Sequence, residues 1–424
     1  MLTLIDKTTK TSWFNYFFMF CIIAIYGGYA TLFARELGDI RTLGNAFALF
    51  ITIVFYIENR IRFNQTFWIS ILVFLSYAAV TSLNNRMING LWIMEWLIWL
   101  VIAYGICKGF GGKLFVVVET VLYHLCIIGF AIWVIHLFYP AFVENMAKML
   151  EFSKPYNSEG NVLANMIVYT VNTKAITTDF GDMYFVLRNS GFAWEPGAFA
   201  SYICLGVFCN ILRNGLTIKG NVVLIVFLVT LLSTQSTTGI MTLLLMLGIW
   251  LIVSRKILWG VLVLPLALYA FSLPFVNDKL FEEINSIEYT DYTTMGKTSL
   301  GRTYSLVLSY EEFLRHPILG LGGYSGGTYY AKQGYEVSLI SGIGNLISQY
   351  GAIMSLLFIY LLVQSCKCIK ELTSSPNAFI LLAVILGMMY SYSIWTTPIY
   401  MAFWMFGAYN SRRVIVLSKP IVRC

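Results

Sequence analysis

The feature that most constrains this chain is a succession of apolar stretches whose lengths suit helices that cross a lipid bilayer. A spanning α-helix needs about 20 mostly apolar residues, and segments near that length follow one another along the whole chain. We therefore predict an all-α polytopic membrane protein with about 12 transmembrane helices, in which residues 1–424 form a single integral membrane domain. The predicted spans cover residues 13–33, 43–57, 66–83, 88–107, 114–139, 193–212, 220–235, 237–254, 257–276, 341–364, 377–394 and 397–410.

The composition supports this class and excludes others. Apolar residues make up 58% of the chain and charged residues only 12%. A soluble globule of this composition could not cover its surface with polar groups, and disorder or a disulfide-stapled secreted module is equally excluded. The net charge of +7 does not indicate nucleic acid as a partner, because the basic residues are scattered and no nucleic-acid-binding pattern occurs.

Loops that alternate along the chain differ in charge. One alternate set, which includes both termini, carries sixteen Lys or Arg residues against three acids. Cytoplasmic loops of membrane proteins are enriched in Lys and Arg, so we assign this set, and both termini with it, to the cytoplasm. The same assignment places two long loops, residues 140–192 and 277–340, on the outer side of the membrane.

Both long loops are predicted to contain short helices. Residues 141–152 are amphipathic and predict a helix that either lies in the membrane interface or packs on the protein itself. A second short helix is predicted at residues 161–169, and residues 172–182 are predicted to be irregular. In the second loop, a helix is predicted from Arg302 to about Arg315.

The segment LRNSGFAWEPGAFASY in the first loop has features that suit anion chemistry. Pro196 is typical of the first turn of a helix, which places Glu195 at the start of a helix that runs inward. The positive end of the helix dipole there stabilises a carboxylate and attracts a phosphate. Arg188 lies seven residues earlier. Two interpretations stay open: a functional pair, or a simple helix cap in which Glu195 pairs with Arg188.

A second charged group lies in the other long loop. Arg302 begins the predicted helix, where the dipole disfavours a cation; a ligand would explain it, and so would an acidic neighbour such as Glu288. Arginine binds phosphate oxygens bidentately and stays charged. His316 is the only histidine in either long loop. It is either an acid–base group or the residue that ends the helix before Pro317.

A glycine-rich stretch, HPILGLGGYSGG, follows that helix. Its glycines permit tight turns, and the stretch either brings backbone N–H groups to an anion or acts as a connector. Arg315, at the end of the helix, and Gly320, in the glycine-rich stretch, are therefore candidate substrate-binding residues.

Polar residues also interrupt the predicted spans. Gln235 and Ser236 lie in an uncharged outer hairpin, STQSTTG, and Asn345 and Gln349 lie in the segment NLISQYG that opens the tenth span. Such groups need partners in hydrocarbon. They either face a cavity, where they would bind substrate, or form hydrogen bonds between helices.

Several signatures of other chemistry are missing. The chain has no GxSxG nucleophile elbow, no HExxH motif and no Asp-x-Asp pair. The pair Cys366-Lys-Cys368 is too short and isolated for a metal site, and the outer loops contain no Cys for a disulfide. We therefore predict neither a metal site nor a cofactor.

Taken together and in this order, the motifs resemble the bacterial O-antigen polymerase and ligase superfamily. The resemblance covers roughly residues 180–365. It rests on the pattern Arg-x2-Gly-x3-Glu-Pro-Gly at 188–197, the segment 233–239, Gly301-Arg302, the sequence HPILG at 316–320, and the segment 345–351 before a final group of helices.

The resemblance implies a GT-C-like membrane glycosyltransferase that acts on glycans carried on undecaprenyl diphosphate, at the periplasmic face of the bacterial inner membrane. A polymerase transfers the growing chain to a new lipid-linked repeat unit, whereas a ligase transfers the finished chain to lipid A–core. Ligases typically carry a His in the segment before residues 345–351. The stretch here reads EVSLISGIGN, so the polymerase branch is favoured over the ligase.

The residues named above fit this chemistry. Arg188 and Arg302 would neutralise the charge that develops on the departing lipid diphosphate, an electrostatic role that usually supplies the largest catalytic contribution. Such a leaving group requires no metal in principle. Glu195 is the first candidate for the base that accepts the proton of the acceptor hydroxyl, and His316 is the second.

Alternatives from other classes stay open. A 12-span transporter or lipid-linked glycan flippase would need polar groups along a path through the membrane, for which Glu95 and Glu119 are the inner candidates. A scaffold that recruits a chain-length regulator protein is a third alternative. The partners expected are undecaprenyl-diphosphate-linked glycans and membrane lipids.

Overall fold

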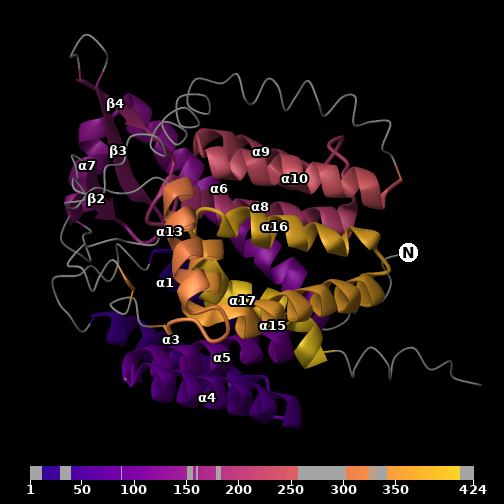
Figure 1. The fold of residues 1–424 in the computed structure, drawn as a ribbon. Helices are drawn as coiled ribbons and strands as arrows, with labels where there is room; N and C mark the ends of the chain where they lie inside the picture. Colours follow the sequence, from indigo (N-terminus) through magenta and orange to yellow (C-terminus); the bar gives the residue numbers. More distant parts are fainter. Residues whose placement is uncertain are drawn as a thin grey trace, which may run out of the picture. The chain divides into compact units, whose positions relative to one another are not determined.

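The structure is a computed structural model that describes residues 12–28, 40–86, 88–149, 156–158, 161–177, 183–255, 302–323, 328–329 and 341–410. Helices make up most of these residues (Figure 1). The chain divides into two compact units, Met1–Asn59 with Phe110–Leu243, and Arg60–Gly109 with Leu244–Cys424. A single membrane domain over residues 1–424 stays a prediction.

The first unit is built from helices and one small sheet. Its helices are α1 (Trp13–Gly27), α3 (Ile40–Glu58), α6 (Leu114–Phe138), α7 (Pro140–Met149), α8 (Pro196–Asn214), α9 (Val222–Ser233) and the first turns of α10 (Thr237–Val253), with a 3₁₀ turn, η2 (Gly111–Lys113), ahead of α6. Local sequence sets several of their ends. Pro196 is the first residue of α8, and the Asn221 side chain accepts a hydrogen bond from the N–H of Leu224 at the start of α9.

Helix α8 forms the interior of this unit. Of its apolar window, 94% is buried, and it packs against α6 and α9. Small residues allow this close packing: a Cβ atom at Gly206 would lie 2.7 Å from the ring of Phe227 on α9. A helix that is apolar all round and enclosed on all sides is a core helix, so α8 holds the residues at its N-terminus in a fixed position.

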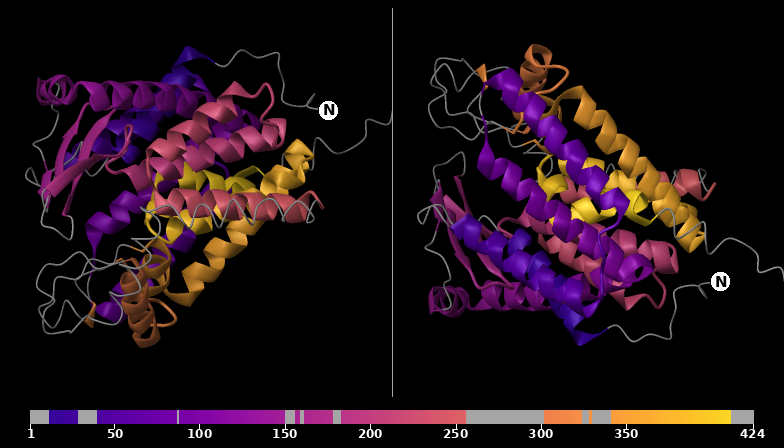
Figure 2. Two further views of the ribbon diagram at one scale, coloured as in Figure 1. Left: turned by 90° about the horizontal axis from the view of Figure 1, so that it is seen from above. Right: turned by 90° about the horizontal axis from the view of Figure 1, so that it is seen from below.

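The first long loop contains a four-stranded antiparallel sheet. Its strands are β1 (Tyr156–Ser158), β2 (Asn161–Asn165), β3 (Thr170–Thr177) and β4 (Met183–Leu187), in the order β1-β2-β3-β4. Leu163 pairs with Asn172, and Thr173 pairs with Leu187. Figures 1 and 2 show the strands beside α7, where Val143 and Ala147 pack against Met166, Tyr169 and Val171.

Two sequence predictions were wrong in this loop, whereas the helix predicted at its start is confirmed as α7. Residues 161–169 form β2 and a turn instead of a helix, and residues 172–177 belong to β3 instead of an irregular segment. A short apolar run does not distinguish a strand from a helix by periodicity, and pairing with a neighbouring strand decides between them. Residues 178–182 lie outside the described residues.

The second unit is helical throughout the part that the structure describes. It contains α4 (Gln65–Asn85), nearly all of α5 (Gly90–Phe110), the rest of α10, α13 (Arg302–Arg315), α15 (Gly342–Thr373), η6 (Pro376–Phe379), α16 (Ile380–Met389), η7 (Ile394–Thr396) and α17 (Pro398–Trp404). Helix α13 packs beside α15 (Figure 1), and its bounds confirm the helix predicted from Arg302 to Arg315.

The helices confirm the class of the protein. Four helical stretches of the described chain are long and apolar enough to cross a membrane: Gln65–Asn85, Gly90–Phe138, Pro196–Asn214 and Gly342–Thr373. Shorter apolar helices of 10–17 residues occur at the other predicted spans, with two exceptions. The span 397–410 contains α17, which has 7 residues, and the span 257–276 lies outside the described residues. The architecture is that of a helical membrane protein with a small sheet in one long loop. The count of about 12 spans and the GT-C likeness stay predictions.

Candidate functional site

The segment from Arg188 to Glu195 is a hydrogen-bonded turn that lies against the hairpin between α9 and α10. The Arg188 guanidinium donates from Nε to the carbonyl of Thr234 (3.2 Å) and from Nη2 to the carbonyl of Gln235 (2.8 Å). These carbonyls follow the last residue of α9, where the negative end of the helix dipole favours a cation. Two motifs that are remote in sequence are therefore joined in the first unit.

The neighbour of Arg188 strengthens this junction. The Asn189 side chain donates to Ser233 Oγ (2.8 Å), and the Asn189 N–H donates to the carbonyl of Ser233 (3.1 Å). Gly191 has a φ of +47°, and a Cβ atom there would lie 2.5 Å from the ring of Phe199, so only glycine fits the turn.

Glu195 occupies the N-cap position of α8 with an extended backbone (φ −154°, ψ 160°). Its carboxylate does not cap the helix, and no ion pair joins it to Arg188 among the described residues. The capping-pair interpretation of Glu195 and Arg188 is therefore wrong. The side chain is half-buried, at the positive end of a helix dipole.

The two candidate residues of the hairpin, Gln235 and Ser236, make different contacts. Gln235 has a φ of +48°, and its carbonyl accepts from Arg188. Ser236 is buried, and its hydroxyl accepts a hydrogen bond from the N–H of Gly239 at the start of α10 (3.2 Å). Two further buried hydroxyl groups, Ser190 Oγ and Thr237 Oγ1, have no hydrogen-bond partner in the described part of the chain. Buried polar groups need partners, so this turn has capacity for water or ligand oxygens.

In the second unit, the end of α13 brings together a carboxylate and an imidazole. Glu312 is buried, and its Oε2 accepts a hydrogen bond from the N–H of Tyr329 (2.9 Å). Its Oε1 lies 3.8 Å from Nε2 of His316, one helical turn later. Arg315 stacks on the ring of Tyr329, with its Cζ atom 3.7 Å from the ring centroid. Glu312 did not emerge from the sequence, although its spacing of four residues from His316 was a usable signal.

The glycine-rich stretch is bonded to a break in α15. Gly351 interrupts the helix with a φ of +67° and a ψ of −175°. The N–H groups of Leu321 and Gly322 donate to the carbonyls of Ser348 and Gln349 (3.1 and 2.8 Å), and the N–H of Ala352 donates to the carbonyl of Pro317 (2.8 Å). The bonds that the broken helix lacks are thus supplied by the loop, as a membrane interior requires.

Gly320 belongs to the same junction. Its N–H donates to the carbonyl of His316 (3.0 Å), and its φ is +65°. Because this amide and those of Leu321 and Gly322 already donate within the protein, the part of the stretch that the structure describes works as a fixed connector. A role of Gly320 in binding substrate stays a prediction.

Aromatic residues from α4 and α5 hold the break in place. Tyr77 Oη donates to the carbonyl of Leu319 (2.7 Å) and lies 3.2 Å from that of Tyr350. Tyr350 Oη in turn accepts hydrogen bonds from the indole N–H groups of Trp92 (3.1 Å) and Trp96 (2.9 Å). Nothing local in the sequence indicates these contacts.

Asn345 and Gln349 lie on one face of the first half of α15, four residues apart. Asn345 is half-buried and Gln349 is 9% exposed. Their amide side chains make no hydrogen bond to any residue that the structure describes, so the helix–helix hydrogen bonds considered from the sequence are not observed for them. Arg302 is the first residue of α13, and its side chain lies outside the description.

The charged groups inside spans differ in their surroundings. Glu119 is buried and forms an ion pair with Arg213, and it accepts a hydrogen bond from Asn210 Nδ2 (2.8 Å). The ion pair with Arg213 accounts for the presence of a charged side chain inside this span, so no transport path is needed to explain Glu119. His136 is also buried, with Nδ1 3.2 Å from Tyr169 Oη and Nε2 3.9 Å from Glu144 Oε1.

One comparison with known proteins supports a relation to the superfamily named above. Residues 222–348 match the family model described as O-antigen ligase. The match begins at α9 and runs into α15, so it includes the hairpin, Arg302, His316 and Asn345. It supports the O-antigen polymerase and ligase superfamily without distinguishing the two branches. The turn from Arg188 to Glu195 lies outside the matched residues. No curated protein matches the chain.

Proposed function

We propose that this protein is a polymerase of undecaprenyl-diphosphate-linked oligosaccharide repeat units, located in the bacterial inner membrane with its active site facing the periplasm. The observation that carries the proposal is the match over residues 222–348, together with the contact between Arg188 and the matched hairpin at Thr234 and Gln235. This contact attaches the Arg-x2-Gly-x3-Glu-Pro-Gly segment to the part of the chain that carries the family signal.

The reaction needs a nucleophile, a leaving group and a base. The acceptor hydroxyl oxygen of a new lipid-linked unit attacks the anomeric carbon of the growing chain, and the bond from that carbon to the diphosphate oxygen breaks. Undecaprenyl diphosphate leaves with the bonding electrons. The hydroxyl proton passes to a base. We assign Arg188 and Arg302 to the charge on the diphosphate. Support for Arg188 comes from its contact with the hairpin at Thr234 and Gln235. Within the described part of the chain, the same turn and hairpin hold two buried hydroxyl groups that lack a hydrogen-bond partner.

Two bases are available to this scheme. Glu195 is favoured because its half-buried carboxylate makes no capping bond and stands at the start of α8, in the same turn as Arg188, where it could accept the proton of the acceptor hydroxyl. His316 is the second candidate, and the buried Glu312 carboxylate 3.8 Å away would orient its ring. Arg315, Gly320, Gln235, Ser236, Asn345 and Gln349 are proposed to contact the glycan or the diphosphate.

An O-antigen ligase is the second candidate, since that is the description of the matching family. The absence of His from EVSLISGIGN favours the polymerase. Both enzymes use the same donor and differ only in the acceptor.

The test uses the full chain in lipid nanodiscs with a lipid-linked repeat unit, and the products are analysed by mass spectrometry. A polymerase yields lipid-linked glycans of two or more repeats together with undecaprenyl diphosphate. Products that form only when lipid A–core is added would identify a ligase. Movement of the lipid-linked unit across the membrane of proteoliposomes, without formation of a new glycosidic bond, would identify a flippase and overturn both the polymerase and the ligase proposals.

Variants test the site residues in the same assay. Arg188→Ala is expected to abolish product formation. Arg188→Lys keeps the positive charge, but its single nitrogen cannot reproduce the hydrogen bonds that Nε and Nη2 donate to the carbonyls of Thr234 and Gln235. Glu195→Gln is expected to remove product, with partial recovery in Glu195→Asp. Glu371→Gln, at an exposed position, is the matched control. Full activity of Glu195→Gln would transfer the role of the base to His316.

A further inference from the structure

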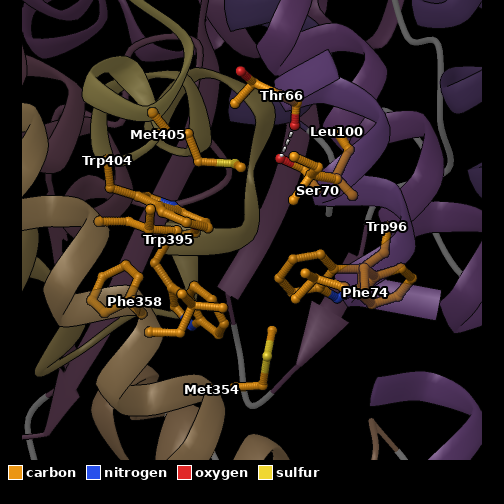
Figure 3. Close-up of a pocket in the computed structure, with 15 residues that line it drawn as sticks. Thr66, Ser70, Phe74, Trp96, Leu100, Met354, Phe358, Trp395, Trp404 and Met405 are labelled. Atoms are coloured by element: carbon orange, nitrogen blue, oxygen red, sulfur yellow. Dashed lines mark hydrogen bonds between the residues drawn. The ribbon is translucent and has the colours of Figure 1, made fainter. Parts of the chain in front are cut away.

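The second unit contains a partly open apolar cavity of about 200 Å³ lined by residues of α4, α5, α15, η7, α17 and the C-terminal helical segment. Figure 3 shows Phe358, Trp395 and Trp404 on one side of the space and Phe74 and Trp96 on the other, with Met354 and Met405 at its two ends. Among its lining residues, only Thr66 and Ser70 carry hydroxyl groups, and the Ser70 hydroxyl donates to the carbonyl of Thr66 (3.0 Å). The walls therefore offer hydrocarbon and aromatic surface.

The walls are held apart by hydrogen bonds and ring contacts. Trp96 donates to Tyr350 Oη (2.9 Å), and the Trp404 indole N–H donates to the carbonyl of Trp395 (2.9 Å). Trp96 also stacks on Phe74, with 5.1 Å between ring centroids. These contacts hold Trp96 and Trp404 in place in the walls of the cavity. Protein interiors are close-packed, so an apolar space of this size held open by fixed walls is suited to a ligand.

The cavity lies along the same helix as two candidate substrate residues. Asn345 and Gln349 precede the break at Gly351, and Met354, Leu357 and Phe358 line the cavity after it. With a rise of about 1.5 Å per residue, these side chains lie roughly 7–14 Å further along α15 than Gln349. The cavity is thus formed by the apolar, membrane-spanning parts of α4, α5 and α15, beyond the polar start of α15.

We propose that this cavity receives part of the polyprenyl chain of the lipid-linked glycan, while the polar start of α15 faces the diphosphate and sugars. The proposal rests on the proposed function, because that function requires a substrate with a polar head and a long hydrocarbon chain. A single helix then contacts both parts of the substrate, and the break at Gly351 separates the two regions.

The direct test is photo-crosslinking of the full chain in nanodiscs. The probe is a polyprenyl diphosphate that carries a diazirine in its chain and no sugar. Crosslinked peptides are expected from the cavity walls on α4 and α15. A second probe, a phospholipid with the diazirine in its acyl chain, identifies the other source of hydrocarbon. Crosslinks to the cavity from the phospholipid but not from the polyprenyl probe would overturn the proposal.

Matched variants make the test specific. Leu357→Trp fills the cavity, whereas Leu356→Trp adds the same side chain at the neighbouring position, which is 70% exposed. Leu357→Trp is expected to lower crosslinking of the polyprenyl probe about tenfold, the effect of excluding about two methylene groups from an apolar site, and Leu356→Trp is expected to leave it unchanged. Equal crosslinking in both variants would overturn the proposal.

A second variant covers the case in which Leu357→Trp does not fold, and a second donor substrate separates a defect in chain binding from a defect in catalysis. Ala408→Phe fills the cavity from another wall and replaces Leu357→Trp if that variant does not fold, as judged by gel filtration. In the polymerisation assay, both cavity variants should slow transfer from a full-length donor but not from a donor with two or three isoprene units. Absence of polymerisation by the unsubstituted protein, with intact probe crosslinking, would reject the proposed function and keep the cavity assignment.

Discussion

Gly320 and Gly351 meet backbone to backbone. A Cβ atom on Gly320 would lie 2.6 Å from the amide nitrogen of Gly351, and a Cβ atom on Gly351 would lie 2.6 Å from the amide nitrogen of Gly320. Both residues have positive φ angles. This contact fixes the segment that follows His316 against the broken helix that carries Asn345 and Gln349, so the two candidate groups of the second unit share one rigid support.

Substituting alanine at Gly351 is therefore expected to destabilise the protein by about 2–6 kcal/mol, since a non-glycine residue with a positive φ and an extended ψ costs about 1–3 kcal/mol and overpacking costs about 1–3 kcal/mol more. The measurement is thermal unfolding in detergent. Gly215→Ala is the control for the backbone alone, because Gly215 has a φ of +69° with nothing within 4 Å of the added Cβ atom. Equal losses in both variants would contradict the close contact.

Removing the Tyr77 hydroxyl is expected to weaken the same junction. Tyr77→Phe leaves the half-buried carbonyl of Leu319 without its 2.7 Å donor, at a cost of about 1–2 kcal/mol. Tyr360→Phe, on the 59% exposed Tyr360 of α15, should leave the unfolding midpoint unchanged. Hydrogen exchange should also quicken at Gly322 and Ala352 in Tyr77→Phe, and unchanged exchange there would argue against a clamp.

The Glu119–Arg213 pair predicts a rescue experiment. Arg213→Ala leaves a buried carboxylate without its cation, which is strongly destabilising for buried pairs. Because the Arg213 side chain is 31% exposed, we expect a loss of about 2–3 kcal/mol, below the range for fully buried pairs. The double variant Glu119→Gln/Arg213→Ala should recover most of it, since a neutral amide needs no cation. A double variant no more stable than Arg213→Ala would show that the arginine acts through packing.

Tyr169 predicts a loss of stability at alkaline pH. Burial of its phenol raises the pKa of Tyr169 above its ordinary value, so the folded protein keeps the proton at a pH where the unfolded chain has lost it. This contribution is fully present below about pH 10 and disappears as the pH rises above it, at about 1.4 kcal/mol per pH unit. The slope of unfolding free energy against pH should flatten in Tyr169→Phe but not in Tyr139→Phe, whose ring is 68% exposed.

The sequence by itself determined the helical membrane class, the start of α8 at Pro196 and the bounds of α13 from Arg302 to Arg315. Hydropathy and capping report the surroundings of a residue within a few turns of its own helix, so they suffice for such features. The order of the sequence motifs indicated the superfamily, and the match over residues 222–348 supports it at that level.

Only the tertiary structure decided which of these motifs meet. Arg188 donates to carbonyls 46 and 47 residues away, and Tyr77 donates to one 242 residues away. The sheet at β2 and β3 likewise depends on pairing between strands. Hydrogen bonds between distant segments leave no periodic pattern in the local sequence. Each segment shows only that it has a donor or an acceptor without a local partner, and the partner comes from a distant part of the chain. The junction at Gly351 and the cavity beyond it are consequences of such long-range bonds.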